Sequence, residues 1–212
     1  MAIIRIKPGV VTAQDGTYPE LRGARKGGLV SQDVGGRYEE GAYRGAIFGV
    51  GQTSAAALTA VGTGVTGLTL FNPTGSGKNL SLLDVSVAFT PLTLATVGIT
   101  VVLAGVAQAA TPTGLTVLTA ASTLVGGGNL PVAKTYSAAT LTTAPIILRV
   151  VGNWQSTVLT TSGGATAVAA LLKDEVAGAI IVPPGAVICL AGIGTVADAS
   201  VIASMTWEEI PL

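Results

Sequence analysis

The 212-residue chain contains no histidine, a single cysteine and few aromatic or charged residues. Without histidine it lacks the side chain that most often acts as a general acid or base near neutral pH and most often binds metals. Zinc sites are built mainly from histidine and cysteine, and one cysteine cannot form a disulfide within a chain. We therefore predict no zinc site and no internal disulfide. We interpret Cys189, which stands in an apolar segment, as a small buried hydrophobic side chain.

The remaining reactive side chains form no recognisable catalytic or cofactor-binding pattern. Glu208 and Glu209 are adjacent, so a strand would place them on opposite faces, and the other acidic residues are too scattered to bind calcium. The segment Gly75-Ser76-Gly77-Lys78 resembles a phosphate-binding loop. However, Asn72 stands where that motif needs its first glycine, and Asn79 stands where it needs serine or threonine. The sequence predicts a plain turn here, and a protein that is not an enzyme and binds no metal and no cofactor.

Charge and hydropathy point to burial against other protein. Eleven basic and eleven acidic residues give a net charge of zero, which does not favour nucleic-acid binding. A mean hydropathy of +0.66 suggests that some apolar surface is covered by other subunits or by membrane. Residues 85–133 and 176–197 are uncharged and long enough to cross a bilayer, but prolines interrupt both, and the first residues are too charged for a secretory signal. We predict contact with further copies of the chain and no membrane insertion.

Charged residues are concentrated at the start of the chain. Twelve of the 22 lie before residue 46, among many glycines, and the segment has no sustained period of 2 or 3.6. Such a segment cannot build a core alone. We predict an extended N-terminal arm over residues 1–45 and a β-sandwich domain over residues 46–212. The arm is either a disordered tail or an anchor that becomes ordered on a partner.

The rest of the chain reads as short strands separated by turns. Abundant Gly, Thr, Ala and Val favour strands over helices. The predicted strands are listed by residue number: 46–50, 66–71, 80–90, 97–104, 115–119, 144–151, 179–182, 186–190 and 200–209. Residues 72–79 form a turn cluster that would join its two flanking strands in a hairpin. Residues 51–64 are predicted as a loop or a weak strand, and residues 125–131 as a loop. The fold class that follows is all-β, an antiparallel β-sandwich with a jelly-roll-like character.

Four details of this prediction can be compared with a structure. In the strand at 80–90, Leu83, Val85, Val87 and Phe89 are expected on one face. In the closing strand, Val201, Ala203, Met205 and Trp207 are expected to face the core. Pro183-Pro184-Gly185 predicts a turn with positive φ at the glycine, and Arg149 is expected at a sheet edge or an interface. Residues 165–175 resemble a short helix, ending in solvated charges at Lys173, Asp174 and Glu175.

Three segments of the sequence resemble a family of bacteriophage virion proteins. They are the end of the arm with the first strand (residues 38–48), the segment Leu70-Phe71-Asn72-Pro73-Thr74-Gly75-Ser76-Gly77-Lys78-Asn79-Leu80, and the ending Trp207-Glu208-Glu209-Ile210-Pro211. Capsid decoration (cement) proteins fit this resemblance best. It implies a sandwich that assembles as a homo-oligomer, commonly a trimer, on the outer capsid surface, where it bridges capsomers. It supplies no catalytic residues.

The resulting functional hypothesis is a capsid decoration protein whose partners are its own copies and the major capsid protein. The alternative is a tail, baseplate or host-receptor-binding protein of the same particle, with a pocket among the loops at 51–64 and 126–131. A weaker alternative is a secreted or membrane-embedded β protein. The candidate partner-binding residues are the basic and aromatic side chains of the arm: Arg5, Lys7, Arg22, Arg25, Lys26, Arg37, Tyr38 and Tyr43.

Overall fold

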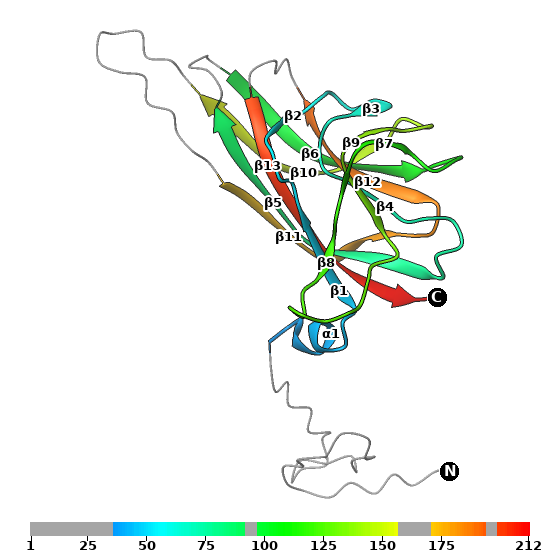
Figure 1. Cartoon of the computed structure of the whole chain (residues 1–212). Helices are drawn as coiled ribbons and strands as arrows, with labels where there is room; N and C mark the ends of the chain where they lie inside the picture. Colours follow the sequence, from blue (N-terminus) through cyan, green and yellow to red (C-terminus); the bar gives the residue numbers. More distant parts are fainter. Residues whose placement is uncertain (1–35, 92–96, 157–170, 194–198) are drawn as a thin grey trace, which may run out of the picture. The chain divides into compact units, whose positions relative to one another are not determined.

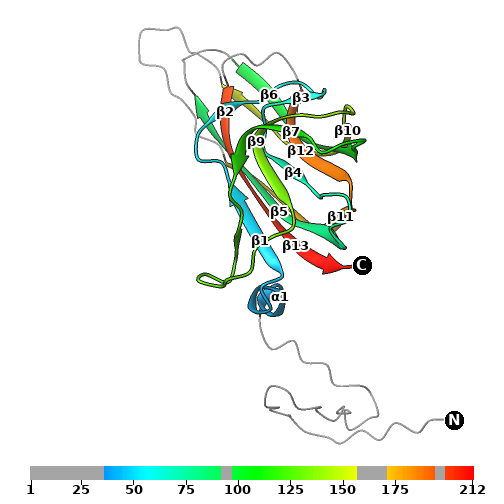
Figure 2. The same ribbon diagram turned by 45° about the vertical axis from the view of Figure 1, so that its right-hand side comes forward.

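Strands make up most of the chain that the computed structural model describes, which comprises residues 36–91, 97–156, 171–193 and 199–212. The strands form two antiparallel sheets packed face to face (Figure 1 and Figure 2). They belong to one unit, Gly41–Leu212, which is separate from Met1–Glu40. The predicted all-β sandwich is therefore confirmed. In the described residues no helix is long and apolar enough to cross a membrane.

The first sheet is built around the C-terminal strand. Its order is β11-β5-β13-β1-β8, and β2 also pairs with β13. The bounds of its strands are β1 (Ile47–Gly51), β2 (Ala56–Ala57), β5 (Lys78–Pro91), β8 (Ala121–Ser122), β11 (Leu171–Val182) and β13 (Ala199–Pro211). A single helical turn, α1 (Glu39–Tyr43), lies within the segment that the sequence predicts as an extended arm.

The second sheet has the order β10-β6-β12-β4-β9-β3, and β7 pairs with β9. The bounds of its strands are β3 (Gly64–Val65), β4 (Thr69–Phe71), β6 (Val97–Ala107), β7 (Thr113–Leu118), β9 (Lys134–Thr140), β10 (Ile146–Ser156) and β12 (Ala186–Ile193). The strand β9 is missing from the sequence prediction. The predicted loop at residues 125–131 is confirmed, and residues 51–64 contain the end of β1, the two-residue strand β2, an isolated bridge at Ala60 and the start of β3.

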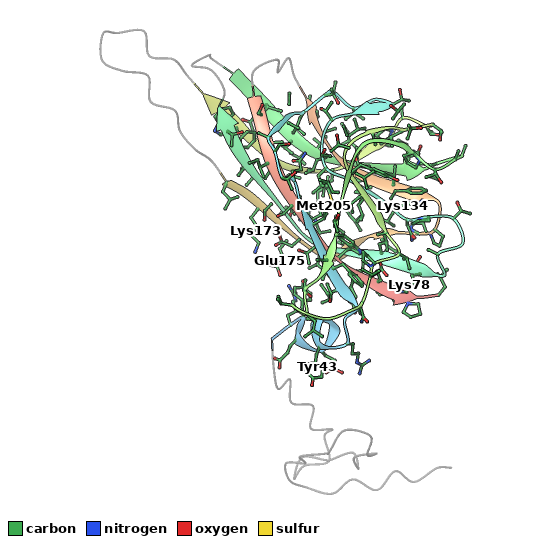
Figure 3. All side chains as sticks on the ribbon, viewed as in Figure 1. Tyr43, Lys78, Lys134, Lys173, Glu175 and Met205 are labelled. Atoms are coloured by element: carbon green, nitrogen blue, oxygen red, sulfur yellow. The ribbon has the colours of Figure 1, made fainter. Side chains whose placement is uncertain are left out.

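The closing strand supplies the centre of the core, as its alternation predicts. Val201, Ala203, Met205 and Trp207 are all at most 1% exposed. The Trp207 ring stacks on Phe48 of β1 with 6.2 Å between centroids. Met205 lies between the two sheets, whereas Lys173 points outward from β11 (Figure 3). Burying a Trp side chain and its aliphatic neighbours between sheets is the main force that holds β13 in its register.

The predicted set of side chains on one face of β5 is wrong at one position, Leu83. Val85 and Phe89 point into the core as expected, but so does Leu82. The register explains the change, because Thr206 of β13 pairs with Asp84 and the next residue, Trp207, pairs with Leu82. Leu83 is thus the extra residue of a β-bulge, and a bulge shifts the inward positions by one residue. Strict alternation along 80–90 could not reveal it.

The predicted helix at residues 165–175 is wrong over the part that the structure describes. Residues 165–170 lie outside that part, and residues 171–175 begin the strand β11, which pairs with β5. The good helix formers are overridden by this pairing, since propensity is a weak signal against tertiary context. The strand also carries a bulge, with positive φ at Ala177 (52°) and Gly178 (83°), opposite the bulge in β5.

The predicted hairpin between residues 66–71 and 80–90 is also wrong, because its two strands lie in different sheets. β4 belongs to the seven-stranded sheet and β5 to the six-stranded one. The connection is a corner held by Asn72, which is fully buried. Its Nδ2 donates to the main-chain oxygens of Lys78 at 2.8 Å and Val182 at 2.9 Å. Turn residues alone do not say whether the next strand returns to the same sheet.

The turn at Pro183-Pro184-Gly185 meets the same corner. Gly185 has the positive φ that the sequence predicts, 83°, and its N–H donates to the main-chain oxygen of Asn72 at 2.8 Å. This turn also passes from one sheet to the other, from β11 to β12. Two turns that are far apart in the sequence thus close the same end of the sandwich.

The outer face of the seven-stranded sheet carries a second, smaller core. Its members include Phe71, Tyr136, Val187 and Cys189. Cys189 is fully buried, as predicted, and burial raises the pKa of its thiol from 9.0 to about 12. The seven-stranded sheet is therefore packed on both faces, which is why β12 is apolar at nearly every position.

Candidate functional site

Most of the predicted partner-binding residues fall outside the described part of the chain. Those residues are Arg5, Lys7, Arg22, Arg25 and Lys26. Of the other three, the Arg37 guanidinium carbon lies 5.7 Å from the centroid of the Tyr38 ring, a cation–π distance. Tyr43 is at the end of α1 and is 76% exposed (Figure 3). The structure therefore brings together Arg37 and Tyr38 and presents Tyr43 on the surface of the sandwich unit.

The most deeply buried charge is the Glu209 carboxylate, whose side chain is 0% exposed. Its Oε2 lies 2.9 Å from Lys78 Nζ, and its Oε1 accepts hydrogen bonds from the main-chain nitrogens of Val132 at 2.8 Å and Ala133 at 3.2 Å. Glu208 is half-buried on the opposite face, as predicted. Because both Glu209 oxygens are engaged, the carboxylate ties β13 to the loop at 123–133 and is not available for acid–base chemistry.

Lys78 itself does not serve a phosphate-binding loop. Gly75 and Gly77 have φ of 77° and 69°, so both glycines are needed for the turn. The segment that follows is the strand β5, whereas a phosphate loop must open a helix. The Lys78 ammonium is directed at Glu209. This agrees with the plain turn predicted from the sequence, although the turn is a corner between sheets.

Two further ion pairs lie on β11. Arg149 of β10 donates from Nη2 to Asp174 Oδ1 at 2.8 Å, and its Nε lies 2.7 Å from Oδ2. Lys173 Nζ lies 3.1 Å from Asp84 Oδ2 on β5. Asp174 is thus part of a bridge between the two sheets and does not belong to a solvated helix end. Among the described residues, no group of three acidic, Cys or His side chains is placed to hold a metal ion.

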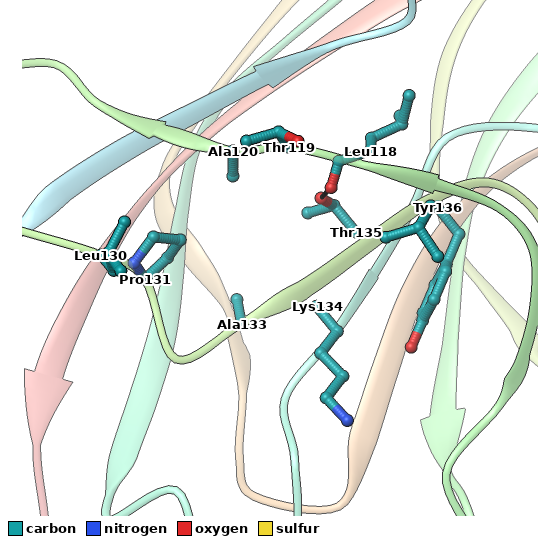
Figure 4. A pocket seen from close by; sticks show the side chains of 10 residues that line it. Leu118, Thr119, Ala120, Leu130, Pro131, Ala133, Lys134, Thr135 and Tyr136 are labelled. Carbon is teal, nitrogen blue, oxygen red and sulfur yellow. Dashed lines mark hydrogen bonds between the residues drawn. The ribbon is translucent and has the colours of Figure 1, made fainter.

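One side of the sandwich carries an apolar groove of about 520 Å³, here called the β7–β9 groove. It is lined by β7, β9 and the loop between them, including Val117, Leu130, Pro131 and Tyr136. Val117 is 71% and Leu130 82% exposed. Lys134 and Tyr136 project to the same side of β9 (Figure 4), and burial raises the pKa of the Tyr136 hydroxyl. The groove includes Leu130 and Pro131 from one of the two loops, 51–64 and 126–131, that the alternative hypothesis names for a receptor pocket.

A second apolar surface follows the edge formed by β10 and β11. It is called the β10–β11 edge and consists of Ile146, Ile147, Leu148, Val150 and Ile181. These large aliphatic side chains are between 43% and 66% exposed. β10 ends the seven-stranded sheet, so the prediction that Arg149 lies at a sheet edge is confirmed.

The β10–β11 edge opens into the gap between the sheets. A cavity of about 260 Å³ is lined there by Leu148, Ile180, Ile181 and Pro183, among others. Leu148 lies against Gly105 of β6, where an added Cβ would be 3.0 Å from its Cδ1. The sequence analysis did not identify this surface. The apolar run at 146–151 was the available signal, but such a run is equally typical of a strand buried on both faces.

A comparison of the chain with family models, with curated proteins and with solved structures found no match.

Proposed function

We propose that this protein is a phage capsid decoration (cement) protein, which binds the outer capsid surface as a homotrimer and stabilises the head by bridging capsomers. The observation that carries the proposal is the way in which apolar and charged side chains are distributed over the surface. Large aliphatic side chains are exposed together on the β10–β11 edge and around the β7–β9 groove, while Lys78, Arg149 and Lys173 are committed to ion pairs. Such a surface suits contact with other protein.

Two of the three segments that resemble virion proteins lie at structurally important positions of the sandwich, which supports this proposal. Residues 70–80 form the corner around Asn72, and residues 207–211 form the end of β13, where Trp207 and Glu209 are buried. We also propose that the sandwich is a jelly roll. Its longer strands alternate between sheets in the orders β11-β5-β13-β1 and β10-β6-β12-β4, an arrangement of two Greek keys.

The test is binding of the purified chain to capsids of the phage whose genome carries the gene. We expect the full chain to saturate the capsids and to raise their resistance to heat. Deletion of residues 1–40 should leave the unit Gly41–Leu212 folded but unable to bind, because the arm is proposed to supply the contact with the shell. If the truncated protein decorates capsids at full occupancy, the role of the arm is wrong. If the full chain does not bind, the proposed function is wrong.

The β7–β9 groove favours a second candidate, a receptor-binding protein of the same particle. The groove combines apolar side chains with the polar groups of Thr119, Lys134 and Tyr136, a combination that suits a sugar ring. A glycan array probed with the full chain tests this candidate. Binding that is lost in Lys134→Ala, a change at an exposed residue of the groove, would support it over capsid decoration, and an array without signal would reject it.

A further inference from the structure

The β10–β11 edge has the size of one half of a protein–protein interface. Its five exposed aliphatic residues together present on the order of 500 Å² of mostly apolar area, at the upper end of what a monomer normally leaves exposed. A standard interface buries about 800 Å² on each partner, and a little over half of that area is apolar. The edge therefore carries the apolar area that one partner of a stable complex needs.

The charges of this surface favour a second copy of the same chain as its occupant. Arg149 of β10 and Asp174 of β11 flank these side chains and neutralise each other, while Lys173 and Glu175 alternate with Asp174 and lie on the other face of β11. A patch with a net charge would repel its own copy, because both copies carry the same sign, whereas a neutral patch does not. Arg149 remains 42% exposed and can also interact with a partner.

The geometry of β10 determines how the contact is made. β10 pairs with β6 alone among the described strands, so its outer edge is free of strand partners there. Register shifts at residues 147–149 and 150–152 interrupt the strand, and such bulges disfavour the addition of another strand to a sheet edge. Ile147 and Val150 pair with Ala104 and Val102, while Leu148 lines the cavity between the sheets. The exposed aliphatic side chains thus wrap around the edge and do not lie on a single face.

We propose that this protein self-associates through its β10–β11 edge, with the side chains of Ile146, Leu148 and Val150 packing against a second copy of the chain. The inference rests on the self-association that the proposed function includes, and it assigns a surface to it. The contact removes aliphatic area from water and is made by side chains and not by extension of the sheet. It leaves the β7–β9 groove available for other partners.

The test is sedimentation velocity of the full chain in the absence of capsids. We expect wild type to sediment as an oligomer of the 20.9 kDa chain, and Ile146→Lys/Val150→Lys to weaken association by about 100-fold, because each copy would bury new, unpaired charges. The matched control, Leu124→Lys/Val125→Lys, changes two aliphatic residues that are 39% and 96% exposed in the loop at 123–133, away from this edge, and should remain oligomeric. A monomeric wild type, or equal behaviour of the two double variants, would overturn the inference.

Crosslinking provides a second readout, which does not depend on whether the protein still folds with the introduced lysines. The only native thiol, Cys189, is fully buried, so an introduced cysteine will be the reactive one. We expect a short bismaleimide to join Val150→Cys chains into dimers and to leave Val125→Cys chains as monomers. The reverse pattern would place the interface elsewhere. Because neither experiment contains capsids, their failure would leave capsid binding, and hence the decoration function, to be decided by its own assay.

Discussion

Replacing Glu209 by alanine should release the end of the loop at 123–133, residues 132 and 133, from β13. The change removes the acceptor of the main-chain N–H groups of Val132 and Ala133, and each buried N–H that loses its partner costs about 1–3 kcal/mol. Loss of the ion pair with Lys78 costs less than loss of these hydrogen bonds, because the Lys78 side chain is 34% exposed and water can hydrate the ammonium. We therefore expect Glu209→Ala to lower the free energy of unfolding by about 3 kcal/mol.

Two companion variants separate the contributions to that loss. Glu209→Gln keeps an oxygen for the two N–H groups but places an amide near the Lys78 ammonium, so we expect a smaller loss of about 1 kcal/mol. Glu208→Ala is the neighbouring control and should stay within about 0.5 kcal/mol of wild type.

Urea unfolding gives the three free energies, and hydrogen exchange reports on the loop directly. The amides of Val132 and Ala133 should exchange faster in Glu209→Ala while the amides of β13 keep their protection. The reasoning is refuted if Glu209→Ala is as stable as Glu208→Ala, or if those two amides exchange at the wild-type rate.

Three other positions give independent predictions, each measured by unfolding of the purified variant. Gly67→Ala should yield little folded protein because its Cβ would collide with the main-chain oxygen of Leu190, whereas Gly64→Ala, with open space around it, should fold normally. Asn72→Asp should destabilise by more than about 2 kcal/mol, since a buried carboxylate would replace a donor facing two main-chain carbonyls, and a wild-type midpoint would contradict this. The raised pKa of Cys189, about 12 against 9.0, means that the unfolded chain loses the thiol proton first, so stability falls as pH rises above 9. Between neutral pH and pH 10 we expect the contribution of Cys189 to the free energy of unfolding of wild type to fall by about 1.4 kcal/mol, a loss that Cys189→Ala does not show. Parallel pH profiles of unfolding for the two proteins would refute this prediction.

The sequence predicted the structure correctly wherever a feature depends on the local sequence of a single strand or turn. The closing strand places Val201, Ala203, Met205 and Trp207 in the core because period-2 alternation is a property of the strand itself. The positive φ of Gly185 follows equally from the local sequence. Both features depend on neighbours within a few residues, so they can be predicted without knowing how the sheets assemble.

The predictions failed where the conformation of a segment depends on the strands with which it pairs. Leu83 was assigned to the same face as Val85, Val87 and Phe89 because nothing in residues 80–90 marks a bulge, which is specified jointly by β11 and β13. The segment at 171–175 has helical propensity but forms a strand because β5 offers an edge for pairing. The hairpin at residues 72–79 was a similar error, since the partners of Asn72 include Val182, which is 110 residues away.

The candidate binding surfaces could be predicted only in part. The expected edge position of Arg149 was correct, and the loop containing Leu130 was anticipated as a possible binding site. The apolar run around Arg149 could not be recognised as surface, because a buried strand and an exposed edge strand have the same composition. Only the strand order, with β10 at the end of its sheet, distinguishes the two.

Cryo-electron microscopy of phage particles, with and without the gene for this chain, tests the proposed role most directly. Capsid decoration predicts two-sheet density on the outer face of the head, in clusters that bridge neighbouring capsomers and are absent from the deletion particles. Heads that look identical in the two preparations, or density that is lost from the tail alone, would contradict it.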